Sequence, residues 1–380
     1  MKIVLLTLSI LVSSIVFAQS GCNTRIANME EYQQMEAAMM QPSLSNNSNC
    51  KTIRVVVHVV YDGASTNEAY NGNITPEQVK SQIRITNQFF RNDSIMTNEG
   101  AALGYQIELA KVDPQGNPTT GIIYHDGSEL FGSAWSEYGL RNSNVNAISA
   151  GTLSETLSWG ADENGKKYLN SYVVSRIDGN TGGGVQAFAY FPTTSIVFAN
   201  YNLFNAFGAE QLEDEYDQNF NLKSYTDLGY TWTHELLHNF AIFHTFQGNS
   251  CTEEVNPMVQ GDRVVDTPPQ TQGSGCSGAC GDISYNVMDY LSQTCKNRIT
   301  EGQVDRANAA IQNSLEDYLV CSGCGGGSGD FNGDGAITII DFSLFSGAFS
   351  CADGDSCYEH VYDLNCDGLI NVVDFSLMDF

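Results

Sequence analysis

The segment HELLHNFAIFH, residues 234–244, constrains the fold of this chain most, because it holds three of only six histidines. Residues four apart lie on one face of an α-helix, so His234 and His238 can direct their imidazoles at one metal ion. Glu235 lies about 100° around the helix from His234, where it reaches a water molecule on that ion rather than the ion itself. The pattern predicts a helix that carries two metal ligands and a general base.

The third histidine requires the chain to turn. On a continuous helix His244 would lie about 9 Å beyond His238 along the axis, whereas zinc binds each histidine nitrogen at about 2.0–2.1 Å. The helix must therefore end between them. In the extended motif HExxHxxGxxH a glycine makes this turn at positive φ, and here the position is Ala241. A left-handed alanine costs on the order of 1 kcal/mol, which a metal site can offset.

A second interpretation of this segment is an amphipathic helix that buries its leucines and aromatic residues and merely satisfies its histidines. The later sequence NVMDY favours the metal site, because Met288 and Tyr290 then lie where metzincins place the Met-turn beneath the zinc. Taken alone, Met288 fits ordinary core and Tyr290 an ordinary turn. With the upstream histidines they predict one zinc ion, with the ligands His234, His238 and His244.

The N-terminus has the pattern of a secretory signal peptide. Residues 1–18 combine Lys2, a long apolar run and Ala18 before the sequence QS. The sequence QSGC resembles a lipoprotein cleavage site only weakly. No later run of 18 or more apolar residues follows, so we expect a secreted product without a transmembrane helix.

Charge and cysteine content narrow the class of protein further. A formal net charge of −27 argues against nucleic acid or an anionic membrane surface as a partner, since both require basic patches. The acidity suits calcium binding, although a solubilising surface would have the same composition. Eleven cysteines in an exported chain predict disulfides, and the odd number leaves at least one thiol outside them.

The order of predicted elements indicates an α+β fold of the zincin type, a twisted sheet over long helices with the metal in a cleft. Residues 19–50 are polar and partly helix-like, which suits a removable prosegment. The Gly-rich sequence 321–329 reads as a linker, so residues 51–320 form the main domain. Within it we expect strands in 52–63, 105–113, 168–177 and 182–192 and helices in 75–93, 226–240 and 300–315.

The C-terminal module, residues 330–380, contains the frame D-x-N-x-D-G-x-I-x-x-x-D twice, in DFNGDGAITIID and DLNCDGLINVVD. Calcium loops need oxygen ligands at positions 1, 3, 5 and 12, a carbonyl at position 7 and a glycine at position 6. An acidic turn without metal is the alternative, but the repetition favours calcium. We expect two ions, held by Asp330, Asn332, Asp334, Ala336 and Asp341 and by Asp363, Asn365, Asp367, Leu369 and Asp374.

Residues 51–320 resemble the pappalysin (cytophagalysin-type) family of metzincin peptidases. The resemblance rests on VVVHVVY, VDPQGNPTTGI, FAYFP, HTFQG, VVDTP and Asn-x-Met-Asp-Tyr, which occur in this order. Residues 330–380 similarly resemble a dockerin type I module whose second helix stops early, at Phe380. This implies a calcium-dependent module with a cohesin-like or cell-surface partner, and the short second helix leaves open a module that recruits no cohesin.

The family resemblance implies zinc-dependent hydrolysis of a polypeptide substrate. Glu235 is then the general base and acid, Tyr290 helps to hold the oxyanion, and Met288 packs beneath the ligands. Three neutral imidazoles would leave a fourth zinc position for water, whose pKa the ion lowers toward about 7. The substrate backbone is expected to pair with the edge strand at 186–191.

Two further sets of residues follow from the resemblance alone. It implies disulfides in the loops around the Met-turn, where four cysteines by themselves allow three pairings. It also implies a calcium ion in the main domain. The disulfides would join Cys251 to Cys280 and Cys276 to Cys295, and the calcium would lie near Asp262, Asp266 and Thr267.

Cys22 resembles the switch cysteine of prosegments in this family. A thiolate in the fourth zinc position would keep a precursor latent until cleavage near residue 50. A Cys22–Cys50 disulfide, or a prosegment without an inhibitory role, is the alternative.

Two rival functions deserve comparison. A thermolysin-like site would take a downstream glutamate as third ligand, which His244 and NVMDY argue against. A secreted binding or matrix protein with an inactive zincin fold would act through its calcium module. Glu235 argues against that, because an inactive copy loses such a residue most easily.

Overall fold

A computed structural model describes most of the main domain and parts of the remaining chain, and the structural statements below concern these residues. They are 21–22, 33, 36–37, 39, 51–66, 71–92, 100–180, 184–192, 203–209, 229–252, 260–276, 280, 285–292, 295–320, 329, 331–332, 337–352, 355, 357–364 and 369–378. The expected signal peptide and nearly all of the linker lie outside them.

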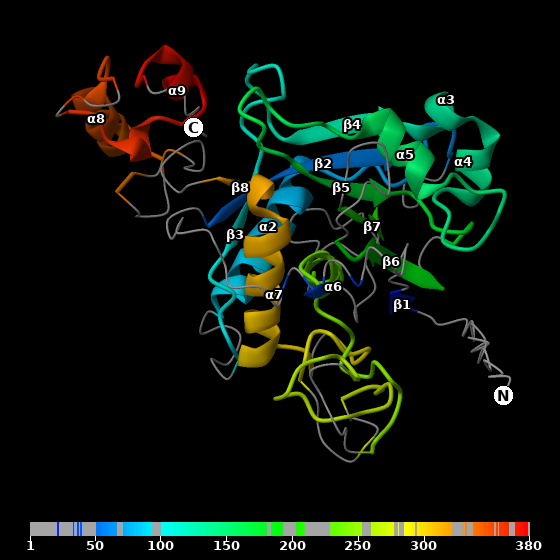
Figure 1. Cartoon of the computed structure of the whole chain (residues 1–380). Helices are drawn as coiled ribbons and strands as arrows, with labels where there is room; N and C mark the ends of the chain where they lie inside the picture. Colours follow the sequence, from blue (N-terminus) through cyan, green and yellow to red (C-terminus); the bar gives the residue numbers. More distant parts are fainter. Residues whose placement is uncertain are drawn as a thin grey trace, which may run out of the picture.

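The main domain is organised around strand β2 (Thr52–Tyr61), which is buried on both faces between Val55 and Val60. Such a continuous β-branched run is typical of a strand within a largely parallel sheet. β2 pairs in parallel with β3 (Gln106–Leu109), β4 (Ile122–Asp126) and β5 (Leu169–Val174), as Figure 1 shows. It pairs antiparallel with the two-residue β8 (Leu319–Val320).

The other half of the sheet contacts the helix that carries the HELLH segment. β7 (Phe204–Gly208) runs parallel to β5, and β6 (Val185–Tyr190) runs antiparallel to β7. Among the described residues the strand order is β1-β6-β7-β5-β2-β3, with β4 and β8 also on β2. The outer edge of β6 is covered by β1 (Gly21–Cys22), which pairs with it in parallel.

Three helices cover one face of the sheet (Figure 1). α2 (Pro76–Arg91) and α7 (Glu301–Ser314) begin with capping boxes, in which a threonine and a glutamine satisfy exposed backbone N–H groups. α6 (Tyr230–Asn239) carries the HELLH segment and packs against α2. The other face packs against short helices, namely α3 (Gly127–Phe131), α4 (Ser133–Tyr138) and α5 (Ala150–Leu157).

The α+β prediction is confirmed, although some elements were not anticipated from the sequence. The four predicted strands correspond to β2, β3, β5 and β6, and the three predicted helices to α2, α6 and α7. β4, β7 and α3 to α5 were not predicted. In the described part of the chain, no helix has the length and apolar character needed to cross a membrane.

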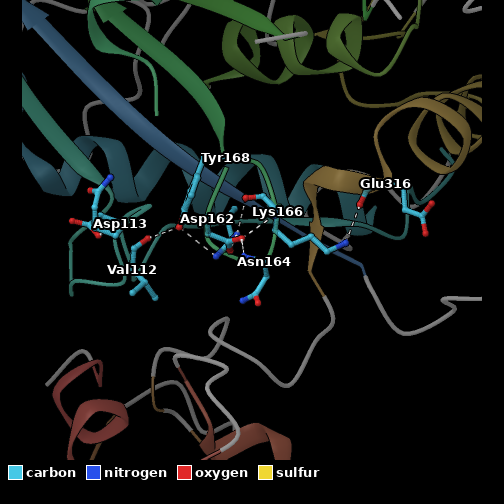
Figure 2. Close-up of polar contacts among 9 residues, drawn as sticks. Val112, Asp113, Asp162, Asn164, Lys166, Tyr168 and Glu316 are labelled. Carbon is cyan, nitrogen blue, oxygen red and sulfur yellow. Dashed lines mark hydrogen bonds and ion pairs between the residues drawn. The ribbon is translucent and has the colours of Figure 1, made fainter. Parts of the chain in front are cut away.

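A polar network connects the turn at Asp162 to the start of β2 (Figure 2). Asp162 accepts hydrogen bonds from the backbone N–H groups of Asn164 and Lys166, which closes a turn. The same carboxylate pairs with Arg54 of β2 at 2.6 Å. The Arg54 guanidinium lies over the ring of Tyr168, whose hydroxyl donates to the carbonyl of Val112. This network is distant in sequence from the histidines, and we assign it a structural role.

The C-terminal module has its own small core and repeats its local structure. α8 (Ile339–Ala348) and α9 (Val372–Ser376) each begin with a capping box, made by Thr338 with Asp341 and by Asn371 with Asp374. A disulfide joins Cys351 to Cys357. Two 3₁₀ helices complete the described elements, η5 (Glu316–Tyr318) in the main domain and η6 (His360–Tyr362) in the module.

Candidate metal centre

Helix α6 is held in place by polar side chains from α2 and from the sheet. Gln82 of α2 donates to the carbonyl of Gly229, the N-cap of α6, at 2.7 Å. Thr86 and Thr233 share a hydrogen bond of 3.0 Å. At the other end, Asn239 donates to carbonyls of the sheet at 2.9 and 3.0 Å. Since all these groups are buried, their hydrogen bonds fix the helix along its axis.

The three histidines meet at one point. The Nε2 atoms of His234 and His238 lie 3.0 Å apart, and that of His244 lies 3.1 Å from each. His234 and His238 donate from Nδ1 to the carbonyls of Val287 and Ile242, both at 2.7 Å. Their Nε2 atoms must then carry lone pairs that face one another.

This arrangement fits a metal ion. A tetrahedral zinc ion bound at about 2.0–2.1 Å separates its ligand nitrogens by roughly 3.3 Å, close to the observed spacing. Among the described residues, this trio is the one group of three or more histidine, cysteine or acidic side chains able to share an ion. Burial lowers the pKa of His238 to about 3 and holds those of His234 and His244 well below their ordinary value. The rings are therefore neutral, as metal ligands must be.

The chain turns toward His244 at Ala241, where φ is 66°. The N–H of Ile242 donates to the carbonyl of Leu237, and the N–H of Ala241 to that of His238. These two bonds form a Schellman motif, the usual C-terminus of a helix, with alanine in place of the common glycine. The helix thus ends where the sequence requires it to.

The Met-turn supports two of the histidines through its backbone. The carbonyl of Val287 accepts from His234, and the carbonyl of Met288 accepts from the N–H of Thr245, next to His244. Met288 itself is fully buried. The ring of Tyr290 lies 4.9 Å from that of His244 and 6.1 Å from that of His234, measured between centroids. Glu235 is fully buried on α6 beside the first ligand.

Asp289 is a buried residue of this turn that the sequence reasoning passed over. Its carboxylate accepts from the N–H groups of Tyr290, at 2.7 Å, and Gly273, at 3.2 Å. Burial raises its pKa above the ordinary value. Asp289 therefore ties the Met-turn to the loop before it. Its position between Met288 and Tyr290 in the motif was the only available signal.

The loops beside the Met-turn are cross-linked in the way the family resemblance implies. Cys251 is joined to Cys280 and Cys276 to Cys295, across 29 and 19 residues. Because these segments have little regular structure, the two disulfides restrict the positions available to the loops around the metal centre.

The edge strand β6 leads directly to the ligands. Phe191, just after β6, places its ring 5.5 Å from that of His238. The backbone of Gly21 and Cys22 forms β1 on the outer edge of β6. The side chain of Cys22 lies outside the described residues, so its relation to the three histidines stays a prediction.

The calcium sites predicted for the main domain and the module are described only in part. Asp262 accepts from the hydroxyl of Thr267, whereas Asp266 accepts from the hydroxyl of Thr300 and the N–H of Gly302 at the start of α7. In the module, the described candidates Asp341, Asp363 and Asp374 are buried, while Leu369 is exposed. Asn332 also lies within the described residues. The remaining candidates, Asp330, Asp334, Ala336, Asn365 and Asp367, lie outside them.

Comparisons with known proteins agree with the geometry. A profile of the peptidase M43 family, described as Pregnancy-associated plasma protein-A, matches residues 157–312, and one described as dockerin type I domain matches 328–379. Extracellular metalloprotease 1 of Coccidioides posadasii is 27% identical over 265 residues, 68% of this chain and 75% of that protein. An extracellular metalloprotease of Sordaria macrospora is 28% identical over 270 residues, 67% and 72% of the two chains.

Two solved structures show the same fold. A mutant of promirolysin from Tannerella forsythia matches with a TM-score of 0.55 and 25% identity, over 76% of this chain and 89% of that one. Mature mirolysin in complex with a cleaved peptide matches with a TM-score of 0.50 and 26% identity, over 71% and 97% of the two chains.

Proposed function

We propose that the chain, which is similar to pappalysin-type metallopeptidases, is made as a latent precursor and cleaves polypeptides at the three-histidine centre. Its family and relatives make it a zinc metalloendopeptidase with a dockerin type I module. Since the curated relatives are extracellular metalloproteases, we propose that residues 1–18 direct its export.

The convergence of His234, His238 and His244 is the observation that carries this proposal, and they would hold one zinc ion. A zinc ion there would lower the pKa of a bound water molecule toward about 7 and polarise the scissile carbonyl. Glu235 takes the proton from the attacking water and returns it to the leaving amine. The Tyr290 phenol, beside the ligands, donates a hydrogen bond to the oxyanion that develops on the substrate.

The position of β1 supports latency. A substrate that pairs with β6 needs the backbone groups along its outer edge. Gly21 and Cys22 pair with that edge in the full chain. We propose that residues 19–50 are a prosegment that covers the edge strand until cleavage near residue 50. Cys22 would occupy the fourth zinc position as a thiolate, while β1 excludes the substrate.

The C-terminal module is proposed to bind two calcium ions through its repeated loops and to attach the enzyme to a cohesin-like or cell-surface partner. Exposed apolar side chains at equivalent positions of the two repeats support this: Ile339 is 75% and Val372 is 65% exposed. They are 33 residues apart, like Asp341 and Asp374. A further calcium near Asp262, Asp266 and Thr267 would stabilise the loop before the Met-turn.

Two substitutions test the assignment of the centre. Glu235→Gln is expected to lower kcat/KM on casein at least about 100-fold and to leave zinc bound, because it removes a base but no ligand. His244→Ala is expected to weaken zinc binding by more than about 100-fold as well, because two histidines leave the site incomplete. Undiminished proteolysis in the first variant, or stoichiometric zinc in the second, would overturn the assignment.

A further inference from the structure

A second contact between residues 19–50 and the main domain lies away from β1. Residues 33, 36, 37 and 39 have helical backbone, and Glu36 is only 8% exposed. Its carboxylate pairs with two arginines: one oxygen accepts from Arg306, and the other lies 2.9 Å from Arg263. In a chain with 17 basic and 44 acidic residues, two guanidiniums around one buried carboxylate form a specific arrangement.

The same helical face supplies an apolar anchor. Met39, three residues after Glu36, packs against a buried cluster that includes Ala241 and Phe243. The two guanidiniums lie over the Phe243 ring, at 4.9 Å for Arg306 and 5.5 Å for Arg263. Both cations therefore pack on the ring of Phe243, and the methionine packs against the cluster that contains this ring.

This contact is connected to the metal centre. Arg306 donates from Nε to the carbonyl of Ala241, at 2.7 Å. Ala241 is the left-handed residue that turns the chain toward His244, and Phe243 directly precedes that ligand. The arginine thus joins Glu36 to the turn that positions the third histidine.

The surroundings of the arginines select the ligand. Glu36 and Met39 line a cavity of about 430 Å³ together with both arginines. Three acidic side chains, Asp266, Glu301 and Asp305, also line it and oppose the entry of a free anion. A helical segment that carries a carboxylate and also buries an apolar side chain gains binding free energy from both contacts. The site therefore favours an acidic residue followed, three positions later, by an apolar one.

We propose that Arg263 and Arg306 form a carboxylate-binding site that holds Glu36 on the main domain and contributes to latency independently of Cys22. The inference rests on the proposed function in one respect, that residues 19–50 are removed on activation. The precursor then has two separate attachments, β1 on the edge strand and Glu36 behind the third ligand. Activation requires both to separate.

The test uses the secreted precursor, residues 19–380, and follows the appearance of proteolytic activity with time. Glu36→Gln removes the charge and keeps the shape, so this variant is expected to mature at least ten times faster than the parent. Glu301→Gln makes the same chemical change in the same cavity, and within the described part of the chain Glu301 forms no ion pair with either arginine. This control is expected to mature within two-fold of the parent. After processing, kcat/KM should be identical in Glu36→Gln and parent, because residue 36 has left the molecule.

A second measurement, amide hydrogen exchange, detects the attachment of Glu36 to the two arginines separately from changes in folding and from self-cleavage. We call this attachment the Glu36 latch. In precursors that carry Glu235→Ala, amide hydrogen exchange of residues 33–39 should be at least ten times faster with Glu36→Gln, and β2 should stay protected. Arg263→Gln should accelerate exchange less, because it breaks only one of the two ion pairs that Glu36→Gln breaks, and the double variant should exchange no faster than Glu36→Gln alone. Arg263 is the better partner to change, because Arg306 also holds the Ala241 carbonyl.

The outcomes distinguish the latch from the proposed latency. If Glu36→Gln matures at the rate of the parent and its residues 33–39 exchange at the rate of the parent, the Glu36 latch is overturned. If Cys22→Ala accelerates maturation while Glu36→Gln does not, the switch stands and the latch fails; the reverse result supports the latch alone. If the intact precursor is fully active, the latency proposal fails, and the exchange measurement still decides whether Glu36 holds the segment.

Discussion

The main domain and the C-terminal module both bury groups that we propose as metal ligands, but they support these groups differently. The histidines lie within an extensive core, and His234 and His238 donate to backbone carbonyls. In the module, Asp341, Asp363 and Asp374 are covered around a small apolar core. Their partners include N–H groups of their own loops, such as those of Thr338 and Asn371.

The difference follows from charge. A neutral imidazole can be buried at little cost once its N–H has an acceptor, whereas several carboxylates buried together repel one another and lose hydration. The main domain can therefore assemble its ligands through its own packing. The module, with few buried side chains, needs cations to offset its acidic loops. We expect the zinc centre to be organised by the fold and the module to be organised by calcium.

Selective removal of each metal is the strongest test of this comparison. A calcium chelator is expected to unfold the module completely, with loss of amide protection in 337–352 and 369–378, while β2 stays protected. A zinc-selective chelator should abolish proteolysis and leave both regions folded. The comparison fails if the module keeps its protection without calcium, or if zinc removal unfolds the main domain.

Glu108 tests the cost of covering a carboxylate within the main domain, because it is half-buried and accepts from a neutral donor, the Gln106 side chain, at 2.6 Å. Burial raises its pKa to about 7, above the ordinary value of 4.5. The folded state then binds the proton more tightly than the unfolded state. The contribution of Glu108 to stability is therefore fully present below pH 4.5 and is lost as the pH rises through about 7.

Glu108→Gln removes this titration. Chemical unfolding should find the variant more stable than the parent by roughly 1–3 kcal/mol at pH 8, and nearly equal to it at pH 4.5. Glu163→Gln, on an exposed turn, is the control and should change neither value. A stabilisation by Glu108→Gln that is equal at both pH values would show that packing, and not charge, limits the burial of this group.

Ala241 gives the smallest expected effect. Ala241→Gly relieves about 1 kcal/mol of left-handed backbone strain. It also removes a buried methyl group and increases the entropy of the unfolded chain, and each of these changes destabilises the fold by a similar free energy. We expect a net change in unfolding free energy within about 1 kcal/mol, with zinc retained. Ala241→Val is the contrasting variant, because a β-branched residue at this φ should destabilise by more than about 2 kcal/mol. Equal behaviour of the two variants would mean that the backbone does not constrain the turn.

Much of the architecture was predictable because its signals are local. The caps at Thr75 and Thr300 mark the starts of α2 and α7, and the apolar run 52–61 marks the central strand. The histidine spacing required a turn between His238 and His244, which the structure makes at Ala241. Such features depend on residues within one or two turns of each other, so a sequence displays them directly.

Only the tertiary structure reveals the elements and contacts that depend on residues far away in the sequence. β7 has five residues without a distinctive pattern and becomes a strand because β5 and β6 offer it two sets of backbone groups. Asn239 acquires its role from carbonyls 35 and 49 residues earlier, and Glu36 from an arginine 270 residues later. Local sequence fixes backbone preferences over a few residues, whereas a buried polar group is stable only where folding supplies its partner.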